Sequence, residues 1–230
     1  MSAKQSRFLQ KQKIAVGISA AVIILILTYL STLLIEETPF IDGFKEGQHY
    51  FLLENPRRIR GDKVEVMEFF SYGCIHCYNL DDDLLDWVDT KKDSINFVRT
   101  PAIANEQWRT FGRAYYAMQA EELLVANHKK VFREIHEVRR NLNSAEGFAQ
   151  LLIPETLPKK RASFIKTFNS LPVTQKIERA DQLSRRFKIA TVPNLVVNGK
   201  YLVRATSSVG LSRMLDVVDH LIELENSPEL

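Results

Sequence analysis

The residues of this chain best suited to chemistry are Cys74 and Cys77, its only two cysteines, separated by Ile75 and His76. At this spacing, two thiols at the start of a helix can close a disulfide with each other. An apolar, strand-like run, Val64–Phe70, precedes the pair, and a helical pattern of apolar residues follows it. Free backbone N–H groups and the helix dipole at such a junction favour a thiolate over a thiol. The predicted chemistry is therefore thiol–disulfide exchange.

The elements that must position this motif alternate between strand and helix patterns. We expect strands at 49–53, 64–70 and 95–99, and a helix at 74–90 between the last two. From 106 to 186 the apolar spacing is helical, and Ser144 is a predicted helix cap. Strands return at 194–197 and 201–203, joined by Asn198-Gly199, a strong hairpin signal, before a last helix at 211–224. This order predicts one α/β sheet domain split by a helical insertion.

Residues 14–35 form a run of 22 residues without a charge. At ~1.5 Å per residue the run spans about 33 Å as a helix, enough to cross a bilayer's hydrocarbon core. Bases precede it and Glu36-Glu37 follows it, which predicts a cytoplasmic N-terminus. A cleaved signal peptide is the alternative, but those have shorter apolar cores and a small-residue cleavage site. A buried core helix would show an amphipathic stripe, which this run lacks. We therefore expect an uncleaved signal-anchor.

The net charge of +3 does not indicate nucleic-acid binding. Residues 1–13 carry four bases and no acid, so the rest of the chain has 27 bases against 28 acids. Two cysteines cannot form a four-thiolate zinc site, and the five histidines lack zinc-finger spacing, so no metal is expected. The run 81–83 of three aspartates is expected to be a solvated helix face, because successive helical residues point in different directions.

Two motifs carry a family resemblance. The run 68–77, Glu-Phe-Phe-Ser-Tyr-Gly-Cys-Ile-His-Cys, resembles the active-site strand and turn of the DsbA-type thiol oxidoreductases, which have a thioredoxin fold. The run 190–201, Ala-Thr-Val-Pro-Asn-Leu-Val-Val-Asn-Gly-Lys-Tyr, is similar to that family's cis-proline loop and following hairpin. The family also has a helical insertion between the two. The resemblance covers residues 49–224 and implies a thioredoxin-like domain at 49–102 and 188–226, with a helical domain at 103–187 and a linker at 36–48.

The resemblance implies a role for each matching residue. Cys74 resembles the exposed nucleophile and Cys77 the buried resolving thiol. His76 would stabilise the Cys74 thiolate, making the disulfide easy to donate. Thr191, Val192 and Pro193 resemble the substrate-binding loop, with a cis bond between the last two. Glu68 resembles a buried acid that helps move the proton of the resolving thiol, with Arg99 as its cation partner; the alternative is a surface acid at a strand edge.

The implied activity is the introduction of disulfides into exported proteins, with no cofactor beyond the Cys74–Cys77 disulfide. Reduced or unfolded exported proteins would be the substrates, and a membrane protein, by family analogy quinone-linked, would reoxidise the enzyme. The catalytic part would face the periplasm from a single-pass inner-membrane anchor.

Three alternatives stay open. Strongly oxidising members of the family often have proline where this chain has Ile75, so a reductase or isomerase with the same fold remains a second interpretation. A thiol-based metal-delivery protein is a third, although four methionines form no cluster. An inert structural disulfide would stabilise little across so short a loop.

Overall fold

The computed structural model describes residues 22–26 and 43–227, and the chain divides into two units, Met1–Gly43 and Phe44–Leu230. Residues 22–26 are helical. The rest of the predicted signal-anchor at 14–35, the basic tail at 1–13 and residues 36–42 of the predicted linker lie outside the described residues. Among the residues that are described, no helix has both the length and the apolar character needed to cross a membrane.

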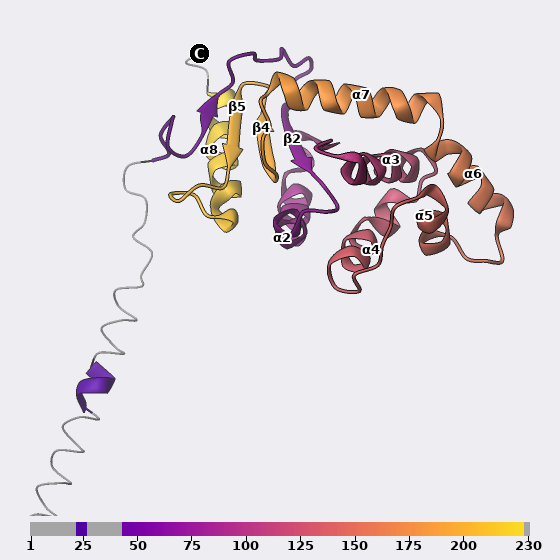
Figure 1. The fold of residues 1–230 in the computed structure, drawn as a ribbon. Helices are drawn as coiled ribbons and strands as arrows, with labels where there is room; N and C mark the ends of the chain where they lie inside the picture. Colours follow the sequence, from indigo (N-terminus) through magenta and orange to yellow (C-terminus); the bar gives the residue numbers. More distant parts are fainter. Residues whose placement is uncertain (1–21, 27–42, 228–230) are drawn as a thin grey trace, which may run out of the picture. The chain divides into compact units, whose positions relative to one another are not determined.

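A five-stranded mixed sheet forms the centre of the second unit, in the order β1-β5-β4-β2-β3 (Figure 1). Strands β2 and β3 are parallel, and the other neighbouring pairs are antiparallel. The strands are β1 (Phe51–Leu52), β2 (Val64–Phe70), β3 (Ile95–Pro101), β4 (Asn194–Val197) and β5 (Tyr201–Arg204).

The predicted hairpin between β4 and β5 is confirmed. Three residues, 198–200, connect the paired residues Val197 and Tyr201, and the N–H of Lys200 closes a tight turn by donating to the Val197 carbonyl at 3.0 Å. Asn198 and Gly199, the central residues of this turn, have the positive φ values of 48° and 64° that such a turn requires. A side chain at Gly199 would also collide with the backbone oxygen of Arg57, so glycine is needed there for space as well as for conformation.

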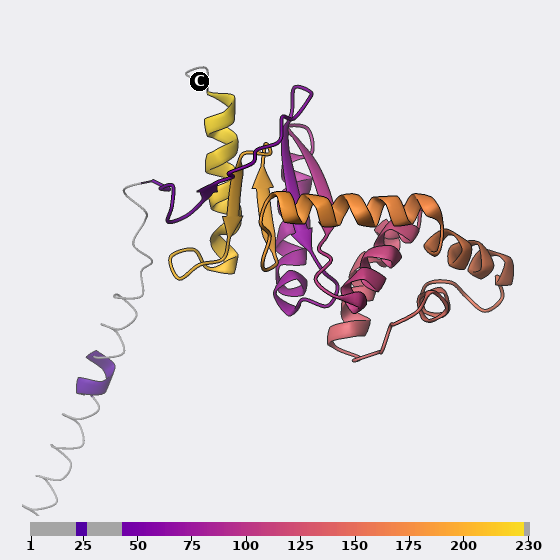
Figure 2. The ribbon, with the colours of Figure 1, turned by 45° about the horizontal axis from the view of Figure 1, so that its top comes forward.

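Helices fill the two intervals between strands that the sequence pattern predicted. Helix α2 (Ile75–Lys91) connects β2 to β3, and five helices separate β3 from β4. Figures 1 and 2 show α3 to α6 gathered to one side of the sheet, with the long α7 leading back to it. The five are α3 (Glu106–Ala120), α4 (Leu124–His136), α5 (Ala145–Leu152), α6 (Pro158–Phe168) and α7 (Leu171–Arg186); a 3₁₀ turn (Leu211–Arg213) and α8 (Met214–Asn226) follow β5.

Side chains of β2 alternate between two buried layers, because successive strand residues point to opposite faces. Val66 packs with Leu80 and Leu84 of α2. Met67 and Phe69 instead join a layer on the opposite face that includes Phe187, just after α7. Glu68 therefore shares the face of Val66 and points toward α2, beneath the cysteines.

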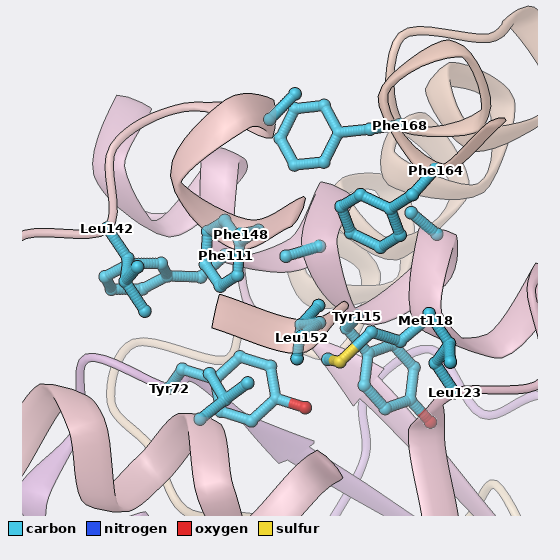
Figure 3. Close-up of a cluster of buried hydrophobic side chains, with 14 of the residues drawn as sticks. Tyr72, Phe111, Tyr115, Met118, Leu123, Leu142, Phe148, Leu152, Phe164 and Phe168 are labelled. Atoms are coloured by element: carbon cyan, nitrogen blue, oxygen red, sulfur yellow. The ribbon is translucent and has the colours of Figure 1, made fainter. Parts of the chain in front are cut away.

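The helical region has its own aromatic core, which continues into the active-site loop. Figure 3 shows side chains of α3, α5 and α6 pointing toward one another, with Tyr72 among them. Cys74 and Cys77 belong to the same buried cluster. Ser144 caps α5 as predicted, its hydroxyl accepting the N–H of Gly147 at 3.2 Å. The reactive loop is thus packed against the helices as well as the sheet.

Candidate active site

Cys74 and Cys77 lie at the start of α2, immediately after β2. Cys74 is the N-cap residue of the helix, and its Sγ accepts a hydrogen bond from the backbone N–H of Cys77 at 3.3 Å. Both thiols are free. Cys77 is fully buried, as predicted, but Cys74 is only 9% exposed, so the prediction of an exposed nucleophile is wrong in degree. Cys74 is buried because the loop that contains Val192 and Pro193 packs against it, and the Val192 carbonyl accepts a hydrogen bond from the Cys74 thiol at 3.3 Å.

The two thiols differ sharply in acidity. The hydrogen bond from the Cys77 thiol lowers the pKa of Cys74 from 9.0 to about 7, against the effect of burial and with help from the backbone N–H groups of Cys77 and His76. Burial, reinforced by the neighbouring Cys74 sulfur, raises the pKa of Cys77. Cys74 is therefore the thiol that ionises near neutral pH. The His76 imidazole is exposed and forms no hydrogen bond within residues 43–227.

The loop facing the cysteines contains a cis peptide bond between Val192 and Pro193, which confirms that prediction. Pro193 is buried, Val192 is half-buried and Thr191 is exposed. The side-chain amide of Asn194 donates to the Thr191 carbonyl and ties the loop to the start of β4. The predicted substrate loop and the predicted nucleophile are thus brought together.

Glu68 is 1% exposed, which excludes the alternative of a surface acid at a strand edge. Its Oε2 accepts a hydrogen bond from Arg99 Nε at 2.6 Å, so the predicted cation partner is confirmed. The two residues stand opposite each other in the β2–β3 register. Burial raises the pKa of Glu68, and the Arg99 charge opposes that rise. A proton-accepting group is therefore buried on the α2 side of the sheet.

The sequence did not predict that Asp81 belongs to this buried site. Its carboxylate accepts from Arg99 Nη2 at 2.6 Å and pairs with His128 Nε2 at 3.1 Å. The prediction of a solvated helix face is wrong for Asp81, which is 2% exposed. Helical spacing was the missed signal, because Cys77, Asp81 and Leu84 recur at intervals of four and three on one face.

The network extends from Asp81 back to the active-site loop. Burial lowers the pKa of His128, while its hydrogen bond to Asp81 opposes this, which favours a neutral imidazole. A neutral ring with Nε2–H directed at the Asp81 carboxylate accepts at Nδ1, where the Tyr72 hydroxyl lies at 2.7 Å. Residues of β2, β3, α2 and α4 therefore form one connected polar group beneath the thiols.

These features define a class of protein before any comparison is made. A dithiol at a helix start, placed against a cis X–Pro loop at the end of the neighbouring interior strands β2 and β4 of a mixed sheet, is the arrangement of a thioredoxin-fold thiol–disulfide oxidoreductase.

Comparison with known proteins gives the family. The chain is 30% identical to the thiol:disulfide interchange protein DsbA of Pseudomonas aeruginosa over 187 residues, 81% of this chain and 88% of that protein. It is 32% identical to the DsbA of Azotobacter vinelandii, over 73% of this chain and 77% of that one. The crystal structure of the Pseudomonas aeruginosa DsbA superimposes with a TM-score of 0.73, covering 80% of this chain and 96% of that structure. The chain belongs to the DsbA family.

One comparison points elsewhere. A family model described as Type IV secretory system Conjugative DNA transfer matches residues 46–192. The match ends one residue before Pro193 and leaves out β4, β5 and α8. The sequence also contains no Gly-x₄-Gly-Lys-Ser/Thr loop, which a nucleotide-driven DNA motor of the P-loop type would need. The DsbA relatives agree with the dithiol geometry, and we assign the chain by them.

The chain is therefore a protein dithiol–disulfide oxidoreductase that introduces disulfide bonds, with a periplasmic catalytic domain. Its substrates are proteins, and a partner returns it to the oxidised state. The alternative reading as a reductase or isomerase is not favoured by these relatives.

Proposed function

We propose that the working oxidant is the disulfide between Cys74 and Cys77 and that the chain needs no other cofactor. A substrate thiolate attacks the Cys74 sulfur, forming a mixed disulfide and releasing Cys77 as a thiolate that takes up a proton. The second substrate thiol, losing its proton, then attacks the mixed disulfide and releases the Cys74 thiolate. Two electrons pass from the substrate dithiol to the enzyme disulfide, so the exchange balances without another reactant.

The single observation that supports this assignment is the contrast between the two sulfurs. Cys74, with a pKa of about 7, is the better leaving group and lies against the Val192 carbonyl. Cys77 is fully buried, so a protein substrate cannot reach it. A thiol with a lower pKa leaves a disulfide faster. Attack of the second substrate thiol on the mixed disulfide is therefore favoured when Cys74 is the sulfur that is released.

The surrounding residues take supporting roles in the proposal. Thr191, Val192 and Pro193 present backbone to an extended substrate segment. Glu68, held by Arg99, takes and returns the proton of Cys77, because it is a buried acid on the same side of the sheet. His76 contributes through its backbone N–H at the helix start.

We also propose that residues 14–35 anchor the enzyme in the inner membrane with the N-terminus in the cytoplasm. The uncharged length of the run and the asymmetry of its flanks support this. Residues 49–102 and 188–226 would act as the redox domain and 103–187 as its helical cover, with a quinone-linked membrane protein as the reoxidising partner. Nucleic acid has no part in the proposed function, because the basic charge belongs to the N-terminal tail.

Two variants test the roles of the cysteines. Cys74→Ser should abolish oxidation of a reduced protein substrate, while Cys77→Ser should accumulate mixed disulfides visible on non-reducing gels. The double variant, which should do neither, is the matched control. Retained turnover in Cys74→Ser would overturn the assignment of the nucleophile.

The redox poise and the anchor are tested separately. A reduction potential of the full-length protein above that of the glutathione couple supports an oxidase, and one near that of thioredoxin supports a reductase. Deleting residues 1–35 and supplying a cleavable signal peptide should move the protein from the membrane fraction to the soluble periplasm. Unchanged fractionation would contradict the proposed anchor.

A further inference from the structure

A cavity of about 370 Å³ lies beside the loop that carries the cis-proline. Its apolar lining comes from two segments, residues 102–104 after β3 and residues 189–190 after α7. The last turns of α7 complete its rim. The volume lies within the range of ~300–1,000 Å³ usual for ligand pockets.

The cavity opens at the same end of the sheet as the dithiol. The backbone N–H of Ala102, in its lining, donates to the carbonyl of Phe70 at 2.8 Å, and Phe70 ends the strand that leads to Cys74. Ala190, on the opposite wall, precedes Val192 by two residues. Consecutive Cα atoms are about 3.8 Å apart, so Ala190 lies within about 7.6 Å of the residue that contacts the Cys74 sulfur.

The backbone between the cavity and the dithiol has free donors. Within residues 43–227, the N–H groups of Ala190, Thr191 and Val192 donate to no other group of the protein. Ala190 and Thr191 are exposed. An extended peptide can pair with such a stretch through main-chain hydrogen bonds, while pockets along it select side chains.

The rim indicates which kind of side chain the cavity suits. Its basic residues already have acidic neighbours, since Arg185 pairs with Asp181 at 3.2 Å and Lys188 with Glu54 at 2.5 Å. The charges at the rim are therefore balanced, with no excess of either sign to select a charged group, and the lining is mainly apolar.

We propose that this cavity is a specificity pocket for an apolar side chain of the substrate, two or three residues from the cysteine that reacts with Cys74. An extended chain advances about 3.3 Å per residue, so two residues cover about 6.6 Å of the span of at most about 7.6 Å from Val192 to Ala190. A third residue allows for the Cys74 sulfur, which lies 3.3 Å beyond the Val192 carbonyl oxygen. The proposal rests on the proposed role of Cys74 and adds the sequence that the enzyme prefers around the substrate cysteine.

Single-turnover oxidation of designed peptides by the oxidised full-length protein tests the pocket. Each peptide carries two cysteines joined by a long Gly-Ser segment, and one leucine is moved from three residues before to three residues after the first cysteine. A serine-only peptide is the reference. We expect the rate to rise by about 10-fold, the usual size for one apolar pocket contact, for leucine two or three residues away on one side.

Two substitutions fill the pocket from opposite walls. Ala104→Phe and Ala190→Phe, both at exposed positions, should reduce the ratio of leucine to serine peptide rates to near one. Ala162→Phe, at an exposed position of α6 away from the cavity, is the matched control and should keep the ratio. Taking a ratio within each variant cancels any general change in activity.

The outcomes separate the two proposals. If the wild type oxidises all peptides at equal rates, or if the preference survives both filled variants, the pocket assignment fails and the role of Cys74 stands. If the wild type oxidises peptides no faster than Cys74→Ser does, the proposed function itself fails.

Discussion

The acidity of Cys74 is expected to depend on the thiol of Cys77, and removing that thiol measures the dependence. The pKa of about 7, against 9.0 for an unperturbed thiol, corresponds to about 2.7 kcal/mol at ~1.36 kcal/mol per pH unit. A hydrogen bond to a charged group contributes about 1.5–3 kcal/mol, and a thiol is a weak donor. Cys77→Ala should therefore raise the pKa of Cys74 by about one pH unit.

The assay is the ultraviolet absorbance of the thiolate, titrated in the reduced protein. At pH 7 about half of Cys74 is ionised in the wild type, and about a tenth should be ionised in Cys77→Ala. Cys77→Ser keeps an O–H donor at the same position and is the matched control, which should titrate close to the wild type. Burial raises the pKa of Cys77, so that thiol stays outside the titration window.

The same shift should appear in the stability of the reduced protein. A group whose pKa is lowered by folding stabilises the fold fully above its unfolded pKa, here near 9, and this contribution is lost as the pH falls through about 7. In the wild type, ionisation of Cys74 should make the free energy of unfolding in urea about 2 kcal/mol larger at pH 9 than at pH 6. In Cys77→Ala the corresponding difference between the two pH values should be about 1 kcal/mol. If the Cys74 thiolate titrates identically in Cys77→Ala and in the wild type, the Cys77 thiol does not lower the pKa of Cys74. The backbone N–H groups at the helix start would then be the cause of the lowered pKa.

Three further substitutions test the surroundings of the dithiol. Glu68→Gln should lower the pKa of Cys74 further, because the negative charge of Glu68 raises the pKa of Cys74 in the wild type. A thiolate titration equal to that of the wild type would contradict this effect of Glu68. Asp81→Asn should cost about 2–3 kcal/mol at pH 7, because Arg99 loses a buried partner. Burial alone would raise the pKa of Asp81, but His128 and Arg99 hold it below its ordinary value, so this cost should shrink in urea unfolding as the pH falls through that lowered pKa. Gly73→Ala should cost about 1–2 kcal/mol and alter tryptophan fluorescence, because a Cβ there would lie 2.9 Å from Trp108 Nε1; thermal unfolding and fluorescence both equal to the wild type would argue against that contact.

The sequence was most informative where a local motif carries the geometry. Cys74 and Cys77 were predicted from their residue type, their spacing and their position between a strand and a helix, whereas the cis bond before Pro193 was expected only from the resemblance of the run 190–201 to the DsbA family. The buried acid at Glu68 and its partner Arg99 were also expected from the resemblance, and the β2–β3 register that places the two residues opposite each other explains why they pair.

The rest of the site depends on contacts between distant segments. Asp81 meets His128, 47 residues away, and His128 meets Tyr72, 56 residues away, so neither contact leaves a local signal. The two aspartates that follow Asp81 also made the run look solvated. The substrate pocket was missed for the same reason, because its walls come from segments on either side of the helical insertion.

The ends of the inserted helices were also hard to predict from residue types. Glu122 and Arg139, with φ of 57° and 59°, take the left-handed conformation after α3 and α4. Glycine usually occupies that conformation at the end of a helix, so Glu122 and Arg139 give no signal in the sequence that a helix ends there. Leu123 and Leu142, which follow these two positions, are both buried in the aromatic core that Figure 3 shows.

The position of β2 in the sheet has a consequence for how the chain folds. Val66 of β2 pairs with Val197 of β4, a partner 131 residues further along the chain. At roughly 5–20 residues per second, that partner is synthesised about 7–26 s later. Until β4 is synthesised, the edge of β2 that pairs with it has no neighbour, although β2 is buried along its whole length in the native state. The nascent enzyme therefore presents an aggregation-prone edge, and periplasmic chaperones that hold extended apolar segments should raise its folding yield.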